Sequence, residues 1–287
     1  RRHGTKSMPV PAPCSRSCSM KRLEDAVERI CGTQVAATQP LAGGDISGAS
    51  RVTLADGRSV VAKHGPLTDR EAAMLQAMAQ LDAPVPAVLG TMQGWLVMQD
   101  VGASQRFDDA AWRSLAHALV PLRGAAQNKS YGWHEDYGFR DIIVRNARRA
   151  NWVEFWRENR LLCHIAALDV SLARRVEALA SRLAGLIPER PDITLLHGDL
   201  WGGNVVWNGT RAWLIDPCAY YGDREVDVAA LTVFDNPPNA FFDGLALEPG
   251  WQDRLPIYRL WMWLIHVRLF GDIYRAAAER DLDALGF

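Results

Sequence analysis

The sequence has no excess of charge of either sign. Its 287 residues include 32 Lys and Arg against 33 Asp and Glu, a formal net charge of −1 at pH 7. Proteins that bind nucleic acid or an anionic membrane through their overall field carry a clear positive excess. We therefore expect neither partner, and the balance favours a small-molecule ligand.

The sequence also lacks the patterns of a disulfide scaffold, a zinc site or a membrane span. Its five cysteines are scattered, with no CxxC pair and no Cys/His quartet. We expect reduced thiols and a cytoplasmic protein. The apolar run LWMWLIHVRLF is interrupted by His266 and Arg268 and is too short to cross a bilayer.

The first nineteen residues lack the apolar core of a signal peptide and are rich in Pro, Ser and basic residues. We expect residues 1–19 to be a disordered tail, with the folded unit beginning near Met20. The rest is an ordinary globular composition, 48% hydrophobic and 23% charged overall, which is enough for a sizeable core.

The pattern of residues 20–101 predicts a small β-rich lobe with one main helix. A short amphipathic helix is expected at 20–31, followed by three β-prone runs that are punctuated by Gly-Gly and Asp-Gly turns and predict an antiparallel meander. Helical spacing over 67–81 predicts the main helix, and 91–102 predicts a hairpin that ends the lobe.

Residues 102–287 show mostly helical spacing, with two short strand-like runs near 205 and 213. The whole pattern predicts an α+β protein with two lobes, in which a larger and mainly helical lobe carries the polar motif described next.

The segment LLHGDLWGGNVVWNG, residues 195–209, concentrates the polar groups of the large lobe between apolar runs. Asp199 and Asn204 have the spacing of a kinase catalytic loop, whose Asp accepts the proton of a substrate hydroxyl and whose Asn holds magnesium. Asp216, after the strand-like AWLI, supplies a second oxygen ligand of the kind Mg²⁺ prefers. His197 fits best as a hydrogen-bonding strut of the loop.

Each of these residues alone would also suit an ordinary turn, because Asp, Asn and Gly are common in loops. Their combination, in order and flanked by apolar strands, favours a phosphotransfer site.

The small lobe offers the other half of such a site. Lys63 lies on the third predicted strand and Glu71 at the start of the predicted helix, as expected for a lysine that holds nucleotide phosphates and a glutamate that positions it. The alternative is that Lys63 is an ordinary surface lysine and that Glu71 only stabilises the helix dipole. The segment AGGDISGAS does not match GxGxxG, but its position predicts a phosphate loop that includes Gly44 and Ser47.

These motifs together resemble the fructosamine kinase family, the ketosamine kinases of the wider aminoglycoside phosphotransferase group. The resemblance rests on LLHGDLWGGNVVW, on LIDPCAYYGDREVDVAALTVF and on weaker matches from about residue 20 to 280. It departs from the family at Gly202, where Ser is common, and at Val267 and Arg268.

The resemblance implies a bilobal protein-kinase-like fold and ATP- and Mg²⁺-dependent phosphorylation of a sugar hydroxyl on a free or protein-linked ketosamine. It makes Asp199 the proton acceptor, Asn204 and Asp216 the magnesium ligands, Lys63 with Glu71 the phosphate clamp, and Gln99, Asp100 and Val101 the hinge that meets adenine. The alternatives are another acceptor of the same superfamily, such as an aminoglycoside, choline or homoserine, and a nucleotide-binding regulatory module without catalysis.

Four further residues are considered for the acceptor. Trp201, Tyr220 and Tyr221 could form a sugar-binding wall, although core packing is equally compatible with the sequence. Asp223 is expected to pair with Arg224 or, as the less favoured alternative, to contact substrate. The acceptor itself and the oligomeric state are left open by the sequence.

Overall fold

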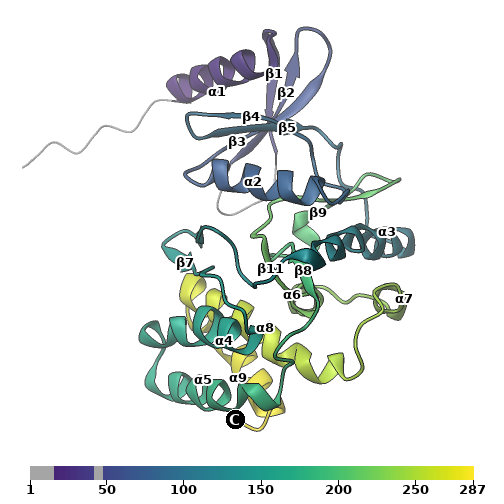
Figure 1. Ribbon diagram of the computed structural model, residues 1–287. Coiled ribbons are helices and arrows are strands. Elements are labelled where there is room, and N and C mark those ends of the chain that lie inside the picture. Colours follow the sequence, from purple (N-terminus) through teal and green to yellow (C-terminus); the bar gives the residue numbers. More distant parts are fainter. Residues whose placement is uncertain (1–15, 42–47) are drawn as a thin grey trace, which may run out of the picture.

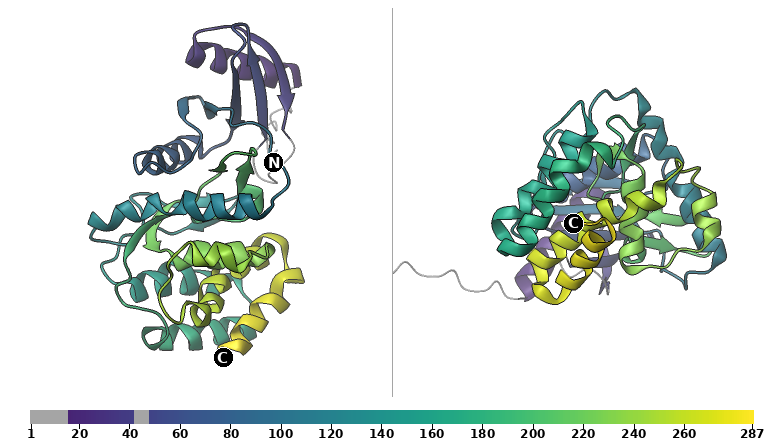
Figure 2. Two further views of the ribbon diagram at one scale, coloured as in Figure 1. Left: turned by 90° about the vertical axis from the view of Figure 1, so that its right-hand side faces the viewer. Right: turned by 90° about the horizontal axis from the view of Figure 1, so that it is seen from below.

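The computed structural model describes residues 16–41 and 48–287, with side chains from Arg22 onward. It has a small sheet-containing lobe above a larger helical lobe, and strands β8, β9 and β11 lie where the two lobes meet (Figures 1 and 2). The α+β class and the two-lobe arrangement expected from the sequence are confirmed.

The small lobe is built on a five-stranded antiparallel sheet with strand order β1-β2-β3-β5-β4. The predicted meander and hairpin both form. The turn between β2 and β3 contains Gly57, whose φ of +86° favours glycine. The strands are Val35–Pro40 (β1), Ala49–Leu54 (β2), Ser59–His64 (β3), Val88–Met92 (β4) and Trp95–Gln99 (β5).

Both faces of this sheet are covered by a helix. Helix α1 (Arg16–Cys31) packs on one face, and α2 (Thr68–Ala79) lies on the other (Figure 1). Strand β5 shows the alternation directly, because Trp95 and Val97 join the α1 cluster while Leu96 and Met98 join the main core. The α2 face of the sheet thereby becomes continuous with the core of the large lobe.

Within the described residues, the large lobe consists of helices and three pairs of very short strands, two of which flank the polar motif. Its helices are Asp109–Leu119 (α3), Trp152–Trp156 (α4), Val170–Arg182 (α5), Glu225–Phe234 (α6), Asn239–Asp243 (α7), Trp251–Phe270 (α8) and Arg275–Ala284 (α9). Its strands are Tyr137–Phe139 (β6), Ile142–Val144 (β7), Ile193–Leu196 (β8), Val205–Trp207 (β9), Ala212–Leu214 (β10) and Tyr220–Asp223 (β11). They pair two by two as β6 with β7, β8 with β11, and β9 with β10.

The short helical turns complete the chain. They are Pro121–Gln127 (η1), Arg157–Leu161 (η2), Leu162–Ala167 (η3), Leu183–Gly185 (η4), Gly202–Asn204 (η5) and Asp272–Tyr274 (η6). The turn η2 is a π-helix and the others are 3₁₀.

Two details differ from the sequence prediction. Helix α1 begins at Arg16, so residues 16–19 belong to it rather than to a disordered tail, and residues 1–15 lie outside the described part. The helical pattern of the large lobe is interrupted after α4 by η2, where Asn159 and Arg160 bond to the carbonyls of Ala147 and Arg145. The extra residue of a π-turn lets both side chains reach that segment.

Candidate active site

The catalytic loop lies between β8 and β9 and contains the predicted acid and amide side by side. Asn204 is buried and donates from Nδ2 to Asp199 Oδ2 at 3.0 Å and to the Asp199 carbonyl oxygen at 2.7 Å. Since both of these hydrogen bonds are donated by its nitrogen, Oδ1 of Asn204 is the atom suited to bind a cation. The loop thus presents a carboxylate and a carboxamide oxygen together.

The loop is fixed from below by helix α6. Both carboxylate oxygens of Asp227 accept backbone N–H bonds, from His197 at 2.7 Å and from Gly198 at 2.8 Å. Gly198 has φ +80°, and a Cβ there would collide with the carbonyl of Cys218. Asp227 therefore holds the start of the catalytic loop.

His197 acts as the strut that the sequence suggested. Its Nε2 bonds to the Ile215 carbonyl at 2.8 Å, so Nε2 carries the proton and Nδ1 accepts from the Asp199 N–H at 3.3 Å. Burial lowers the pKa of His197 to about 4, against the opposing carbonyl of Ile215. The imidazole therefore stays neutral and structural near pH 7.

Asp216 is brought to the loop by the segment after β10. Ile215 donates to the Asn204 carbonyl at 3.0 Å, and Cys218 donates to that of His197 at 2.9 Å. Between them Asp216 has φ +55°, a left-handed conformation that Asp tolerates better than most residues. These bonds place Asp216 beside the catalytic loop on a fixed backbone.

Lys63 connects this segment with the small lobe. Its Nζ lies 2.7 Å from Glu71 Oε2 on α2 and 2.9 Å from Asp216 Oδ1. Lys63 and Glu71 are almost fully buried. Burial alone would lower the pKa of Lys63, but the Glu71 and Asp216 carboxylates outweigh it and raise that pKa, so the ammonium group stays charged.

Asp199 lies in an environment suited to accepting a proton. Burial raises the pKa of its carboxyl to about 7, the Asn204 hydrogen bond opposes the rise, and the charges of Asp216 and Asp227 add to it. A base works best when its pKa is near the operating pH. The carboxylates also make this end of the cleft negative, which suits a cation.

The residues present fit a magnesium ion. Asn204 and Asp216 offer oxygen ligands, and the described residues contain no group of three or more His, Cys, Asp or Glu that would enclose a metal by themselves. Mg²⁺ is typically held by one or two protein oxygen ligands together with substrate phosphates. The donor set therefore matches a metal shared with a phosphorylated ligand.

A cavity of about 350 Å³ opens above these residues. At one end it is lined by Lys63, Asp199, Asn204 and Asp216, and its remaining wall is mostly apolar and aromatic. That wall comes from β6, α6, α8 and η6, with Trp201 added from the catalytic loop, and its other members are Tyr137, Gly138, Phe139, Ala230, Phe234, Met262, Ile265, His266, Leu269, Phe270 and Tyr274.

Most of this wall was missed in the sequence. Met262, Ile265, His266, Leu269 and Phe270 follow the i, i+3, i+4 spacing of one helical face, so the signal was present. It could not be told from a core-facing stripe without knowing what packs opposite. His266 bonds through Nδ1 to the Met262 carbonyl at 2.7 Å, which leaves Nε2 as an acceptor.

Of the four residues considered for the acceptor, the structure brings only Trp201 to the cleft. Tyr220 is completely buried, and its ring stacks on Phe155 and lies under the guanidinium of Arg160. Tyr221 packs against Trp133 and Arg148 instead. Of the two interpretations left open for Tyr220 and Tyr221, the structure therefore favours packing over a sugar-binding wall.

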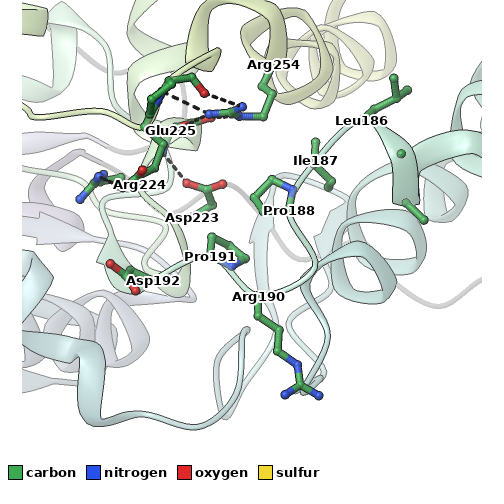
Figure 3. A pocket seen from close by; sticks show the side chains of 14 residues that line it. Leu186, Ile187, Pro188, Arg190, Pro191, Asp192, Asp223, Arg224, Glu225 and Arg254 are labelled. Atoms are coloured by element: carbon green, nitrogen blue, oxygen red, sulfur yellow. Dashed lines mark hydrogen bonds and ion pairs between the residues drawn. The ribbon is translucent and has the colours of Figure 1, made fainter.

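Asp223 lies at the opposite end of β11, in a second cavity of about 550 Å³ (Figure 3). It accepts from Tyr258 Oη at 2.7 Å, while Arg224 pairs with Glu248 at 3.1 Å, so the predicted Asp223–Arg224 pair is wrong. This cavity is larger than the cleft. Its Arg254 is paired with Glu225 at 2.6 Å, so that guanidinium is not free to bind an anionic ligand. It contains none of the catalytic-loop residues, so volume alone does not mark the site.

The expected hinge follows β5, but its groups are largely engaged. The Gln99 N–H donates to Ala87, the Asp100 carboxylate pairs with Arg51 at 2.6 Å, and the Val101 carbonyl accepts from Asn208 Nδ2 at 3.1 Å. A contact with adenine through Val101 would therefore use its N–H. Gly44 and Ser47 of the expected phosphate loop lie outside the described residues.

Gly202, where the family commonly has Ser, allows a close contact with Asp235, the residue that directly follows α6. Its N–H donates to Asp235 Oδ2 at 2.7 Å, and a Cβ at this position would lie 2.6 Å from Asp235 Oδ1. A serine in this conformation would require Asp235 to move.

The fold and this site define the chain as a phosphotransferase with a protein-kinase-like fold. The fructosamine kinase family model matches residues 20–285. A probable ketoamine kinase of Lactiplantibacillus plantarum is 30% identical over 269 residues, covering 87% of this chain and 94% of the relative.

Solved structures agree. The crystal structure of a candidate fructosamine-3-kinase from Thermobifida fusca is 30% identical, with a TM-score of 0.82 over 92% of this chain and 96% of that one. An aminoglycoside phosphotransferase in complex with AMP-PNP and hygromycin B shares the fold at 17% identity, with a TM-score of 0.60 over 91% and 97%. The chain belongs to the fructosamine kinase family.

Among the described residues, no helix is long and apolar enough to cross a membrane.

Proposed function

We propose that this protein transfers the γ-phosphoryl group of ATP to a sugar hydroxyl of a ketosamine, using Mg²⁺. The proposal is carried by one observation: elements of both lobes bring four polar residues to one end of a single cleft, with Glu71 bonded to the first of them. The four are Lys63, Asp199, Asn204 and Asp216. Family membership supports a ketosamine as the acceptor.

The chain's own residues supply three functions in this reaction. Asp199 orients the attacking hydroxyl and accepts its proton as the oxygen forms a bond to the γ-phosphorus. The bond from that phosphorus to the β–γ bridging oxygen breaks, and ADP leaves with the electron pair. Lys63, steadied by Glu71, neutralises phosphate charge from the small-lobe side.

Asn204 and Asp216 would hold the metal, which supplies charge neutralisation for the phosphates when bound. His197 and Asp227 do not touch the reacting atoms. They fix the backbone that carries Asp199, so that its carboxylate is already in position before the acceptor binds.

The proposal is tested by measuring MgATP-dependent turnover with a panel of free and lysine-linked fructosamines and ribulosamines. Aminoglycosides, choline and homoserine serve as comparison acceptors, and the phosphorylated product is identified by mass spectrometry. We expect turnover confined to the ketosamines. Turnover only with a comparison acceptor would retain the chemistry and discard the substrate class.

Nucleotide binding without turnover of any acceptor would instead support a regulatory module. Titration of the protein with MgATP in the absence of acceptor separates this outcome from a protein that does not bind nucleotide.

A further inference from the structure

An arginine beside the cleft, Arg140, forms no ion pair with any residue that the structure describes. Strands β6 and β7 pair from Tyr137 opposite Val144 to Phe139 opposite Ile142, which makes Arg140 and Asp141 a two-residue turn. Arg140 is exposed and, within the described part of the chain, takes part in no ion pair. Its charge is therefore available to a ligand.

The backbone of Arg140 is in a conformation that does not favour arginine. Its φ is +54°, in the left-handed region, and two-residue hairpin turns place Gly, Asn or Asp at such positions. Glycine would adopt this conformation without strain. Stability of the hairpin does not explain an arginine here, and strained residues gather at functional sites.

The side chain of Arg140 lies against one residue of the cleft wall, Phe270. Its guanidinium carbon lies 5.4 Å from the centroid of the Phe270 ring, and Phe270 lines the cleft with 41% of its surface exposed. The residues just before Arg140, Gly138 and Phe139, also line the cleft. A guanidinium stacked on an aromatic ring keeps its planar edge free to bind carboxylate or phosphate oxygens.

The charges along the cleft are unevenly distributed. Its lining carboxylates, Asp199 and Asp216, are at the catalytic end, and Lys63 there is already bonded to Glu71 and Asp216. The wall from α6 and α8 contributes apolar and aromatic groups and the imidazole of His266. A ligand that fills the cleft thus meets an unpaired cation only at Arg140 within the described lining and rim.

We propose that Arg140 selects acceptors that carry an anionic oxygen group, a carboxylate or a phosphate, on the part of the molecule remote from the phosphorylated hydroxyl. The inference rests on the proposed function. A ketosamine formed from a free amino acid has a carboxylate beside the ketosamine nitrogen and fits this arrangement. A ketosamine on a protein lysine has no carboxylate at that position.

The test compares kcat/KM for a ketosamine acid, such as fructosyl-valine, with that for its carboxamide. A second pair compares a ribulosamine with and without a 5-phosphate, which distinguishes the two sources of the anion. Each pair is measured with the wild type and with Arg140→Gly, Arg140→Gln and Arg140→Lys.

We expect the wild type to favour the anionic member of one pair about tenfold, as one charge-assisted hydrogen-bonded contact allows. The ratio falls towards one in Arg140→Gly and Arg140→Gln and is partly kept in Arg140→Lys. Because glycine relieves the strain, Arg140→Gly keeps or raises the melting temperature and leaves the KM for ATP unchanged.

Equal ratios in the wild type and Arg140→Gly for both pairs, with ketosamine turnover intact, would overturn the role of Arg140 alone. Absence of turnover with every ketosamine would overturn the proposed function and this inference with it.

Discussion

Lys63 is the residue through which the two lobes meet at the reacting end of the cleft. It bonds to Glu71 of the small lobe and to Asp216 of the large lobe, so one ammonium group balances two carboxylates. Removing one partner from a buried pair leaves an uncompensated charge, which costs far more than the pair contributes.

Replacing Glu71 with Gln is expected to raise the KM for ATP about tenfold, because Lys63 then turns further towards Asp216 and away from the phosphates. The free energy of unfolding should fall by at most about 3 kcal/mol, since Asp216 remains as a partner. Steady-state kinetics and chemical denaturation measure the two effects. Glu135→Gln, which removes the exposed pair with Arg70, is the matched control and should change neither. An unchanged KM in Glu71→Gln would remove the pair from nucleotide binding.

Among individual residues, the sequence predicted the polar residues of the catalytic site better than the residues that form the apolar and aromatic wall of the cleft. The spacing of Asp199 and Asn204 and the order of Lys63 and Glu71 are local signals, and the structure brings all four to one place. Tyr220 and Tyr221 could not be placed in the same way. Which side of β11 faces a cleft depends on its pairing with β8, and that pairing is not a local property.

Helix α6 determines the shape of the catalytic loop at the level of elements. Its first turn carries Asp227, which accepts two backbone N–H bonds from the loop, and the residue after the helix, Asp235, accepts a third from Gly202. A carboxylate can accept both bonds at Asp227, whereas an amide presents one oxygen and one donor.

Asp227→Asn is therefore expected to lose one of these two hydrogen bonds, because the side-chain NH₂ of Asn would face a backbone N–H of His197 or Gly198. The expected cost is about 2 kcal/mol of unfolding free energy, together with a fall in kcat that exceeds the change in KM for ATP. Asp253→Asn, in the exposed first turn of α8, is the control. If Asp227→Asn keeps both the wild-type kcat and its stability, the loop is not held by this helix.

The longer elements were predictable because the apolar residues of each one recur with the spacing of a helix or a strand. The meander, α2 and the β4–β5 hairpin agree closely with their turn and spacing signals. The strands β6 and β7 were missed because three residues are too few to show an alternating pattern. The π-turn η2 was missed because it depends on bonds from Asn159 and Arg160 to another segment. The β6–β7 turn that carries Arg140 lies between two of the missed elements, so sequence alone could not point to it.

The molecule as a whole contains a buried histidine that links its stability to pH. His164 is almost fully buried and accepts from Arg268 at 3.1 Å. Burial, with the nearby charges of Arg268, Arg160 and Arg145, lowers its pKa to about 3. The folded protein therefore keeps His164 neutral at pH values where the unfolded chain, with an ordinary histidine pKa near 6.5, binds a proton.

His164 therefore does not lower the free energy of unfolding above about pH 7, but it lowers that free energy progressively as the pH falls from about 6.5 towards 3. Between pH 7 and pH 5 the loss amounts to about 2 kcal/mol. Denaturation curves of His164→Gln should show a correspondingly smaller loss over that interval than the wild type. His117→Gln, at an exposed site on α3, should retain the wild-type dependence. Identical pH dependence in all three proteins would contradict a neutral buried His164.

The central claim is that Asp199 accepts the proton of the acceptor hydroxyl during phosphoryl transfer in a cleft assembled from both lobes. The most direct measurement is single-turnover transfer from bound MgATP to a ketosamine by Asp199→Asn, with nucleotide affinity determined on the same sample. We predict that nucleotide affinity is retained and that the transfer rate falls by about 10² to 10⁴, the range of general-base catalysis. Transfer at the wild-type rate with normal nucleotide binding would contradict the account.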